Sequence, residues 1–207
     1  MPNFDFSTIA AKTAISRRGL SVPTRELIAN GFIKSDDSLL NHGRGRAETD
    51  ANTLANLVRF YAEYDPNYAP DRSVLNAKYD VVLSNYVLNV LPPELREKAW
   101  EDIQKATGRN GAAFISVRSS GDRTMQGESY ADGIITKRGT FQKPYTREGF
   151  MEETSQYFAN VEFLKIPSSV SFTVKATNPM GVGRPMDTNQ IDINTLRRLS
   201  GNLDHSE

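Results

Sequence analysis

The strongest constraint on the fold is the alternation of strand-like and helix-like segments over the first 118 residues. Apolar, β-branched runs predict strands, and apolar residues at helical spacing predict helices between them. Parallel strands need a crossover connection, which is usually a helix. The chain is therefore predicted to form an α/β fold with a doubly wound, mostly parallel sheet. The expected strands are 38–42, 59–66, 78–85 and 112–118, and the expected helices are 22–31, 48–58 and 92–108.

The second half of the chain is less regular. Residues 119–145 are polar and glycine-rich without a clear period, which predicts a long loop covering the sheet. A helix capped by Thr146 should follow, and then a terminal pair of strands at 161–166 and 171–176, one of them antiparallel. A single domain is expected over 1–177, with 1–34 as an N-terminal arm and helix. Residues 178–207 are predicted to be a polar, weakly ordered tail with one short helix around Leu196.

Composition excludes several kinds of chemistry. Twenty-five Lys and Arg balance 25 Asp and Glu, so no overall positive field attracts nucleic acid. No cysteine is present and the only histidines are His42 and His205, which argues against thiol chemistry, a Ser/His/Asp triad and a metal site. The chain has no apolar run long enough for a membrane span and no secretory signal at its start, so a cytoplasmic protein is expected.

The segment Leu39–Asp50, LLNHGRGRAETD, carries the strongest local signal for a ligand site. A strand ends there in Gly43-x-Gly45 and a helix begins, so backbone N–H groups can approach a ligand and the helix N-terminus favours an anion. Asp65 lies about 20 residues further on, at the end of the next strand, where a carboxylate can accept both ribose hydroxyls of a nucleoside. The alternative readings are a plain tight turn at the glycines and a turn residue before Pro66.

A second cluster of polar residues follows the third strand, in SNYVLNVLPP. The carboxyl ends of strands in an open α/β sheet form the ligand crevice, so Asn85 and Asn89 are predicted to face it. Amides in so apolar a run need hydrogen-bond partners when they are buried. Either the backbone or a ligand could supply these partners.

Four blocks in order, KTAISRRGLSVPTREL, HGRGRAETD, DVVLSNYVLNVLPP and DGIITKRGTFQKPYT, resemble a family of methyltransferases found beside DNA phosphorothioation genes and in small phage and bacterial proteins. More broadly, the chain resembles the class I S-adenosylmethionine-dependent methyltransferases. That resemblance implies a Rossmann-like sheet of seven strands with the last inserted antiparallel, S-adenosylmethionine as cofactor and methyl transfer as activity. The cofactor-binding residues expected are Asn41, His42, Gly43, Gly45, Asp50, Asp65, Pro66 and Asn85.

The sequence departs from the family pattern at two positions of the glycine loop. Asn41 stands where an acidic residue is usual, and Ala47 replaces the third glycine. Asn41 supplies no negative charge for the amino group of methionine, so Asp50 or Glu48 is expected to compensate. The DPPY-type motif of enzymes that methylate base amino groups is absent, which gives adenine-N6 or cytosine-N4 methylation no support.

Residues 132–145 mix basic and aromatic side chains and should lie over the active face. They could bind phosphate and stack on a base, or form a solvated loop. The predicted substrate-binding residues are Asn89, Lys137, Arg138, Phe141 and Lys143.

The function predicted from these features is S-adenosylmethionine-dependent methyl transfer to nucleic acid or a nucleotide-like acceptor. Any base would come from Asp, Glu, Tyr or Lys, and none is assigned. One alternative is a protein that binds S-adenosylmethionine without transfer, which Asn41 and Ala47 favour. Another is an enzyme using a nicotinamide cofactor, although the full GxGxxG motif is lacking.

Overall fold

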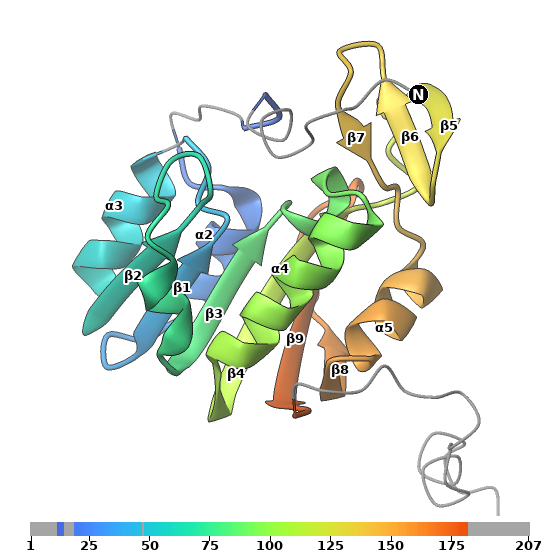
Figure 1. Ribbon diagram of the computed structural model, residues 1–207. Helices are drawn as coiled ribbons and strands as arrows, with labels where there is room; N and C mark the ends of the chain where they lie inside the picture. Colours follow the sequence, from blue (N-terminus) through green and yellow to red (C-terminus); the bar gives the residue numbers. More distant parts are fainter. Residues whose placement is uncertain (1–11, 15–18, 47, 182–207) are drawn as a thin grey trace, which may run out of the picture.

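The computed structural model describes residues 12–14, 19–46 and 48–181 and contains a six-stranded central sheet (Figure 1). The strand order is β2-β1-β3-β4-β9-β8, with β1, β2, β3 and β4 parallel and β9 antiparallel between β4 and β8. The α/β fold with one antiparallel strand is therefore confirmed. The bounds are β1 Ser38–His42, β2 Phe60–Tyr64, β3 Tyr79–Asn85, β4 Thr107–Arg118, β8 Phe158–Phe163 and β9 Ser171–Pro179.

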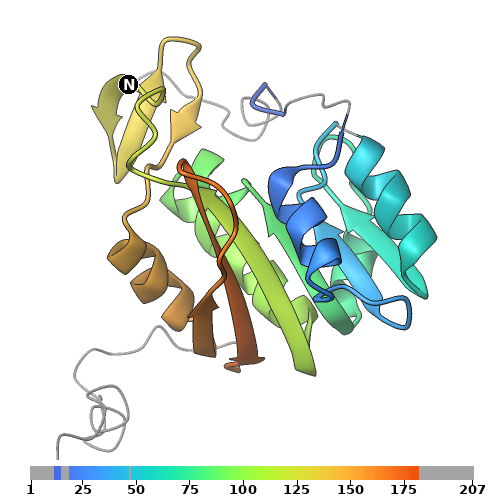
Figure 2. The same cartoon turned by 180° about the vertical axis from the view of Figure 1, so that it is seen from behind.

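Helices cover both faces of this sheet, as a doubly wound fold requires. Helices α4 (Pro93–Ala106) and α5 (Arg147–Ser155) lie on one face, and α2 (Val22–Ala29) and α3 (Glu48–Leu57) lie on the other (Figures 1 and 2). Successive side chains of a strand point to opposite faces. Leu40 and Val82 accordingly pack with Trp100 of α4, whereas Leu39 packs with Leu54 of α3. This two-sided burial explains why these strands read as continuous apolar runs.

Short-range signals place the helix ends where the sequence predicts them. The side chain of Ser21 caps α2 by accepting from the Thr24 N–H at 3.4 Å, and Gly31 with φ +71° follows its last turn. Two short 3-10 helices, η1 (Arg72–Asn76) and η2 (Leu88–Val90), flank β3. No helix among the described residues is long and apolar enough to cross a membrane.

Two expectations about strands are wrong. The central sheet has six strands in the described residues instead of seven, and β2 forms its edge. Strand β4 begins at Thr107 and so includes the end of the expected helix 92–108 and the residues between it and the expected strand 112–118; its pairing with β3 shifts register between Tyr79 and Val81. A Cβ on Gly111 would lie 2.5 Å from the Tyr79 carbonyl oxygen, so glycine permits this close crossing.

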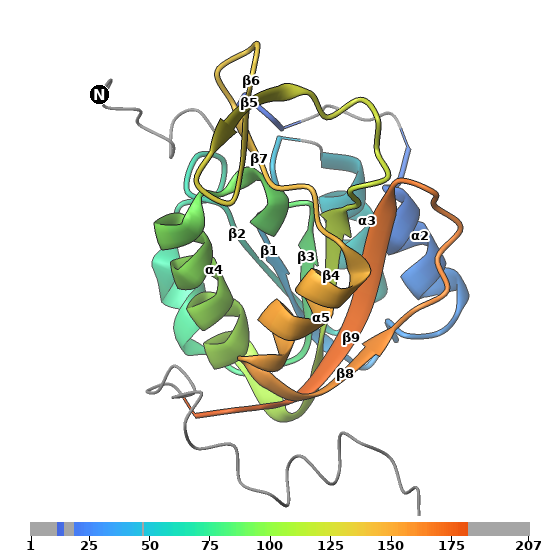
Figure 3. The same cartoon turned by 90° about the vertical axis from the view of Figure 1, so that its right-hand side faces the viewer.

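The segment 119–145 is also not the loop that its composition suggests. It folds into a small antiparallel sheet of β5 (Gly127–Tyr130), β6 (Gly133–Thr136) and β7 (Phe141–Gln142) above the carboxyl ends of the main strands (Figure 3). Every residue of β5 is exposed and no residue of β6 is fully buried, so the alternation that identifies a half-buried strand is missing. Of the predicted tail, Asn178 and Pro179 belong to β9, and everything from residue 182, including the helix around Leu196, lies outside the described residues.

Candidate functional site

A cleft of about 1130 Å³ lies at the carboxyl ends of β1, β2, β3 and β4. Its walls include the glycine loop after β1, the segment Lys12–Ala14, the first half of α4 and the small sheet. All eight predicted cofactor-binding residues line it, as do Asn89, Lys137 and Arg138. The cleft is thus the place where parallel α/β sheets usually bind ligands.

The glycine loop needs glycine at its first position for two physical reasons. Gly43 has φ +72° and Gly45 has φ +65°, a backbone region that L-residues rarely adopt. A Cβ on Gly43 would also lie 2.2 Å from Cγ2 of Val87, which follows β3. The Gly43 N–H donates to the Tyr64 carbonyl at 2.7 Å, so the loop is fixed between the ends of β2 and β3.

Asp65 is buried beside this loop and binds three backbone N–H groups of its own chain. Its carboxylate accepts from Gly45 at 3.0 Å, Asn67 at 2.8 Å and Tyr68 at 3.1 Å. A carboxylate offers about four lone-pair positions. Only one position is therefore left for a ribose hydroxyl, whereas the place of Asp65 in the sequence predicts that its carboxylate accepts two ribose hydroxyls. Asp65 also holds the glycine loop against the end of β2.

The two acids expected to compensate for Asn41 lie in different surroundings. Asp50 accepts from the Ser21 N–H at 2.8 Å, from the Ser21 hydroxyl at 2.6 Å and from the Thr24 hydroxyl at 2.8 Å, which joins α3 to the start of α2. It still lines the cleft with its charge. Glu48 is exposed and is not part of the cleft wall, so Asp50 is the better placed of the two.

Asn85, which lines the cleft, has an unused acceptor. Its Nδ2 donates to the Thr24 hydroxyl at 3.0 Å, while its Oδ1 is buried and has no hydrogen-bond partner in the described part of the chain. Asn41 is tied through Nδ2 to the Tyr61 hydroxyl at 3.1 Å. A buried acceptor without a partner costs about 1–3 kcal/mol, a cost that a ligand donor would remove. The Asn85 oxygen is thus suited to bind an N–H group.

His42 is another polar residue of the cleft without hydrogen-bond partners. Only 3% of its surface is exposed, and neither ring nitrogen has a partner among the residues that the structure describes. Burial, with a smaller contribution from the charge of Arg72, lowers the pKa of His42 from 6.5 to about 4. The imidazole is therefore neutral at pH 7 and adds no positive charge to the cleft.

This lowered pKa predicts a loss of stability in mild acid. Between pH 6.5 and 4 the unfolded chain takes up a proton at His42 that the folded protein does not, so folding is weakened as the pH falls. Replacing His42 by Met removes this pH-dependent loss of stability. Relative to its value at pH 7, the stability difference between variant and parent should shift by about 2 kcal/mol in favour of the variant at pH 5. Urea unfolding at both pH values measures it, and an unchanged difference would contradict the burial argument.

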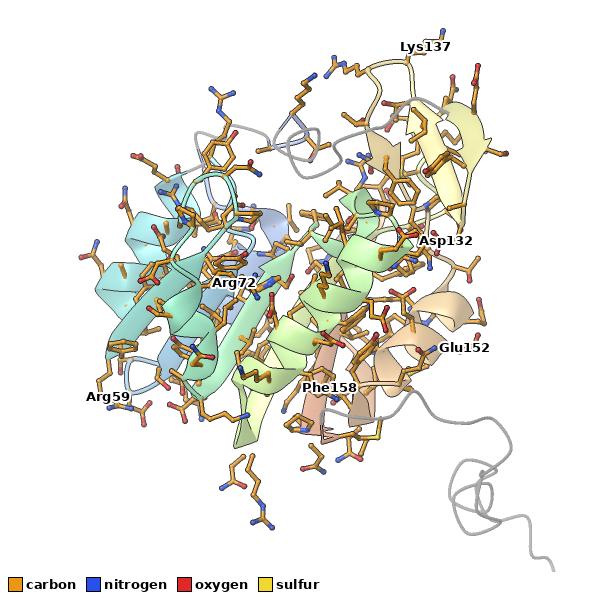
Figure 4. All side chains as sticks on the ribbon, viewed as in Figure 1. Arg59, Arg72, Asp132, Lys137, Glu152 and Phe158 are labelled. Atoms are coloured by element: carbon orange, nitrogen blue, oxygen red, sulfur yellow. The ribbon has the colours of Figure 1, made fainter. Side chains whose placement is uncertain are left out.

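The residues predicted to contact substrate separate into two groups. Lys137 and Arg138 lie in the exposed turn between β6 and β7, and Figure 4 shows Lys137 at the tip of the small sheet. Phe141 is 1% exposed, so its ring is not available to stack on a base, and Asn89 is 1% exposed with its Nδ2 donating to Gln142 at 3.3 Å. Lys143 binds Asp132 at 2.8 Å and Glu153 at 2.6 Å. These three residues fix the small sheet to the main body.

Sequence reasoning missed two charged groups, Arg72 in the cleft and Arg96, which does not line it. Arg72 bridges the Tyr64 hydroxyl at 2.8 Å and Asp102 at 3.0 Å on one wall of the cleft. Arg96 of α4 contacts Asp132 and binds Glu153 at 3.0 Å, anchoring the small sheet. The acidic partners of Arg72 and Arg96 are 30 or more residues away along the chain, and no local pattern reveals such pairs.

Known structures share this fold. The DhpI–SAH complex aligns with a TM-score of 0.54 and 13% identity over 76% of this chain and 84% of that chain. The *Burkholderia thailandensis* 1,6-didemethyltoxoflavin-N1-methyltransferase, with 1,6-didemethyltoxoflavin and S-adenosylhomocysteine bound, aligns with a TM-score of 0.50 and 16% identity over 75% and 76%. The apo S-adenosylmethionine-dependent methyltransferase SibL aligns with a TM-score of 0.51 and 14% identity over 76% and 55%. No protein-family model and no curated protein matches the sequence.

These similarities define the class of fold. The strand order, the inserted antiparallel strand and the similar structures together identify the Rossmann-like fold of S-adenosylmethionine-dependent methyltransferases. The association with DNA phosphorothioation that the sequence resemblance implied is not tested by any of them.

Proposed function

We propose that the chain is a methyltransferase that binds S-adenosylmethionine in the cleft at the carboxyl ends of its strands. The observation that carries the proposal is the glycine loop, held at positive φ and packed so closely on Val87 that no side chain fits at Gly43. Such a loop brings backbone N–H groups to a ligand at the start of a helix. The DhpI and 1,6-didemethyltoxoflavin-N1-methyltransferase structures that share the fold hold S-adenosylhomocysteine.

The polar groups of the cleft match the parts of this cofactor. The buried Oδ1 of Asn85 is a free acceptor for the amino group of methionine, and the carboxylate of Asp50 lies on the same wall. Asp65 keeps one acceptor position for a ribose hydroxyl. The amide oxygen of Asn85, together with Asp50, would then take the role of the acidic residue that is usual at the position of Asn41.

Methyl transfer asks little of the protein beyond alignment. A lone pair of the acceptor forms the new bond to the methyl carbon, and the electrons of the carbon–sulfur bond return to sulfur, leaving a neutral thioether. The cofactor supplies the electrophile, so the protein positions the two reactants in line and excludes water. Lys137 and Arg138 at the mouth of the cleft favour an acceptor with phosphate groups, such as a nucleotide or nucleic acid.

A transfer assay with S-adenosyl-[methyl-³H]methionine tests this function. Mononucleotides and short single- and double-stranded oligonucleotides should be offered as acceptors, with boiled protein as the background control. We expect label in at least one of these acceptors. Tight cofactor binding without label in any acceptor would instead favour a protein that binds the cofactor without transferring its methyl group.

A further inference from the structure

The cleft concentrates positive charge although the whole chain has none in excess. The chain carries 25 basic and 25 acidic residues, but eight Lys and Arg residues and only three Asp residues line the cleft. Five of the eight basic residues form no ion pair with any described residue. These five are Lys12, Arg46, Lys98, Lys137 and Arg138.

The acidic residues of the cleft offset these charges only in part. Asp102 is paired with Arg72 at 3.0 Å, so the two cancel. Asp50 and Asp65 keep their negative charges, since only neutral hydroxyl and backbone N–H groups of the chain bind them, but both lie on the glycine-loop side and are fewer than the five unpaired basic residues. In the part of the wall formed by residues 118–142, no Asp or Glu lines the cleft among the residues described.

The unpaired basic residues come from several sides of the cleft. Lys12 lies in the N-terminal segment, Arg46 follows the glycine loop and Lys98 belongs to α4, while Lys137 and Arg138 come from the turn of the small sheet. A cleft lined by one sign of charge raises the local concentration of the opposite sign. An anion bound between these residues would face basic groups from both lips.

This charge distribution conflicts with binding S-adenosylmethionine alone. Its sulfonium and ammonium groups outweigh its carboxylate, so the cofactor carries a net positive charge, whereas S-adenosylhomocysteine has a neutral sulfur. We infer that the methyl acceptor carries a phosphate group that binds among the unpaired basic residues, and that acceptor and S-adenosylmethionine bind cooperatively because each offsets the charge that opposes the other. The inference rests on the proposed function and adds to it the residues that bind the phosphate of the acceptor and the cooperativity between acceptor and S-adenosylmethionine.

Calorimetry at low ionic strength tests the electrostatic part without a known acceptor. In the parent protein, S-adenosylhomocysteine should bind more tightly than S-adenosylmethionine. Replacing Lys98 and Arg138 by Gln should shift the ratio of the two affinities about fourfold toward S-adenosylmethionine, since two unit charges at a separation of about 10 Å alter an affinity about twofold at the dielectric constant of water. Replacing the exposed Lys34, at the opposite end of β1, by Gln removes a charge without altering the cleft and should leave the ratio unchanged. The shift should disappear at about 1 M salt, where screening reaches only about 3 Å.

Added anions test the cooperative part. Pyrophosphate, AMP and a trinucleotide should each be titrated with both cofactor forms. We expect at least one of them to raise the affinity for S-adenosylmethionine severalfold and to change that for S-adenosylhomocysteine much less. An effect of AMP identifies a free nucleotide as the source of the phosphate, and an effect of the trinucleotide alone identifies nucleic acid. If neither the charge changes nor any of the anions alters the ratio of the affinities for S-adenosylmethionine and S-adenosylhomocysteine, the inference is overturned although the cofactor still binds. Failure to bind either cofactor form would overturn the proposed function itself.

Discussion

Replacing Gly43 by Ala is expected to lower the affinity for S-adenosylhomocysteine more than tenfold. The new Cβ would lie 2.2 Å from Cγ2 and 3.1 Å from Cγ1 of Val87, and the residue would also have to keep φ +72°. Val87 is β-branched and stiff at χ1, so the glycine loop must move instead. A displaced loop loses the alignment of its N–H groups. Titration calorimetry on the folded variant measures the loss.

Gly31 provides a matched control for the backbone strain. Gly31 has nearly the same φ, +71°, but a Cβ there would meet no atom within 4 Å, and it lies far from the cleft. Gly31→Ala should therefore cost about 1–2 kcal/mol of stability and leave cofactor affinity unchanged. Adding Val87→Ala to Gly43→Ala removes both close methyl groups and should restore part of the affinity. Equal binding by the parent and Gly43→Ala would show that the loop does not contact the cofactor.

Replacing Glu153 by Ala is expected to have the largest effect on stability, about 3–5 kcal/mol. The Glu153 carboxylate binds Arg96 at 3.0 Å and Lys143 at 2.6 Å, and it accepts from the Trp100 indole at 2.7 Å. The Arg96 side chain is only 7% exposed. Removing the carboxylate leaves this guanidinium partly uncompensated and the indole N–H without its acceptor. Urea unfolding gives the free energy of unfolding of parent and variant.

The neighbouring Glu152 is the control for this change. It is exposed on the outer side of α5 (Figure 4) and forms no ion pair among the described residues. Glu152→Ala should change stability by less than about 0.5 kcal/mol. Asp132 and Lys143 connect the same network to the small sheet, so Glu153→Ala should also speed hydrogen exchange in β6 and β7. Similar unfolding energies for the two variants would contradict the role given to the network.

The main sheet was predictable because its signals are local. Runs such as Leu39–Leu40 and Val81–Leu83 identify strands, and Pro93 and Gly31 mark helix ends. The small sheet was not predictable, because its strands are polar and owe their place to ion pairs such as Lys143 with Glu153 and Arg96 with Asp132. Arg96 and Asp132 are 36 positions apart, and neither composition nor periodicity indicates which distant residues will pair.

At the candidate site, too, the sequence predicts which residues are present but not which contacts they make. Asp65, Asp50 and Asn85 line one cleft, as the sequence predicts, because each follows a strand or begins a helix at the same edge of the sheet. It does not show that the chain's own N–H and hydroxyl groups already occupy most of the Asp50 and Asp65 carboxylates. Phe141 was assigned to stacking from its basic neighbours, yet the folding of the small sheet buries its ring.

The most direct test of the account is titration calorimetry of the full chain with S-adenosylhomocysteine, S-adenosylmethionine and NAD at low ionic strength. Both sulfur compounds should bind at one site per chain, and NAD should bind weakly or not at all, because Glu48 stands where the GxGxxG dinucleotide fingerprint has its third glycine. Binding of NAD in preference to both sulfur compounds, or of none of the three, would contradict the assignment of the cleft as an S-adenosylmethionine site.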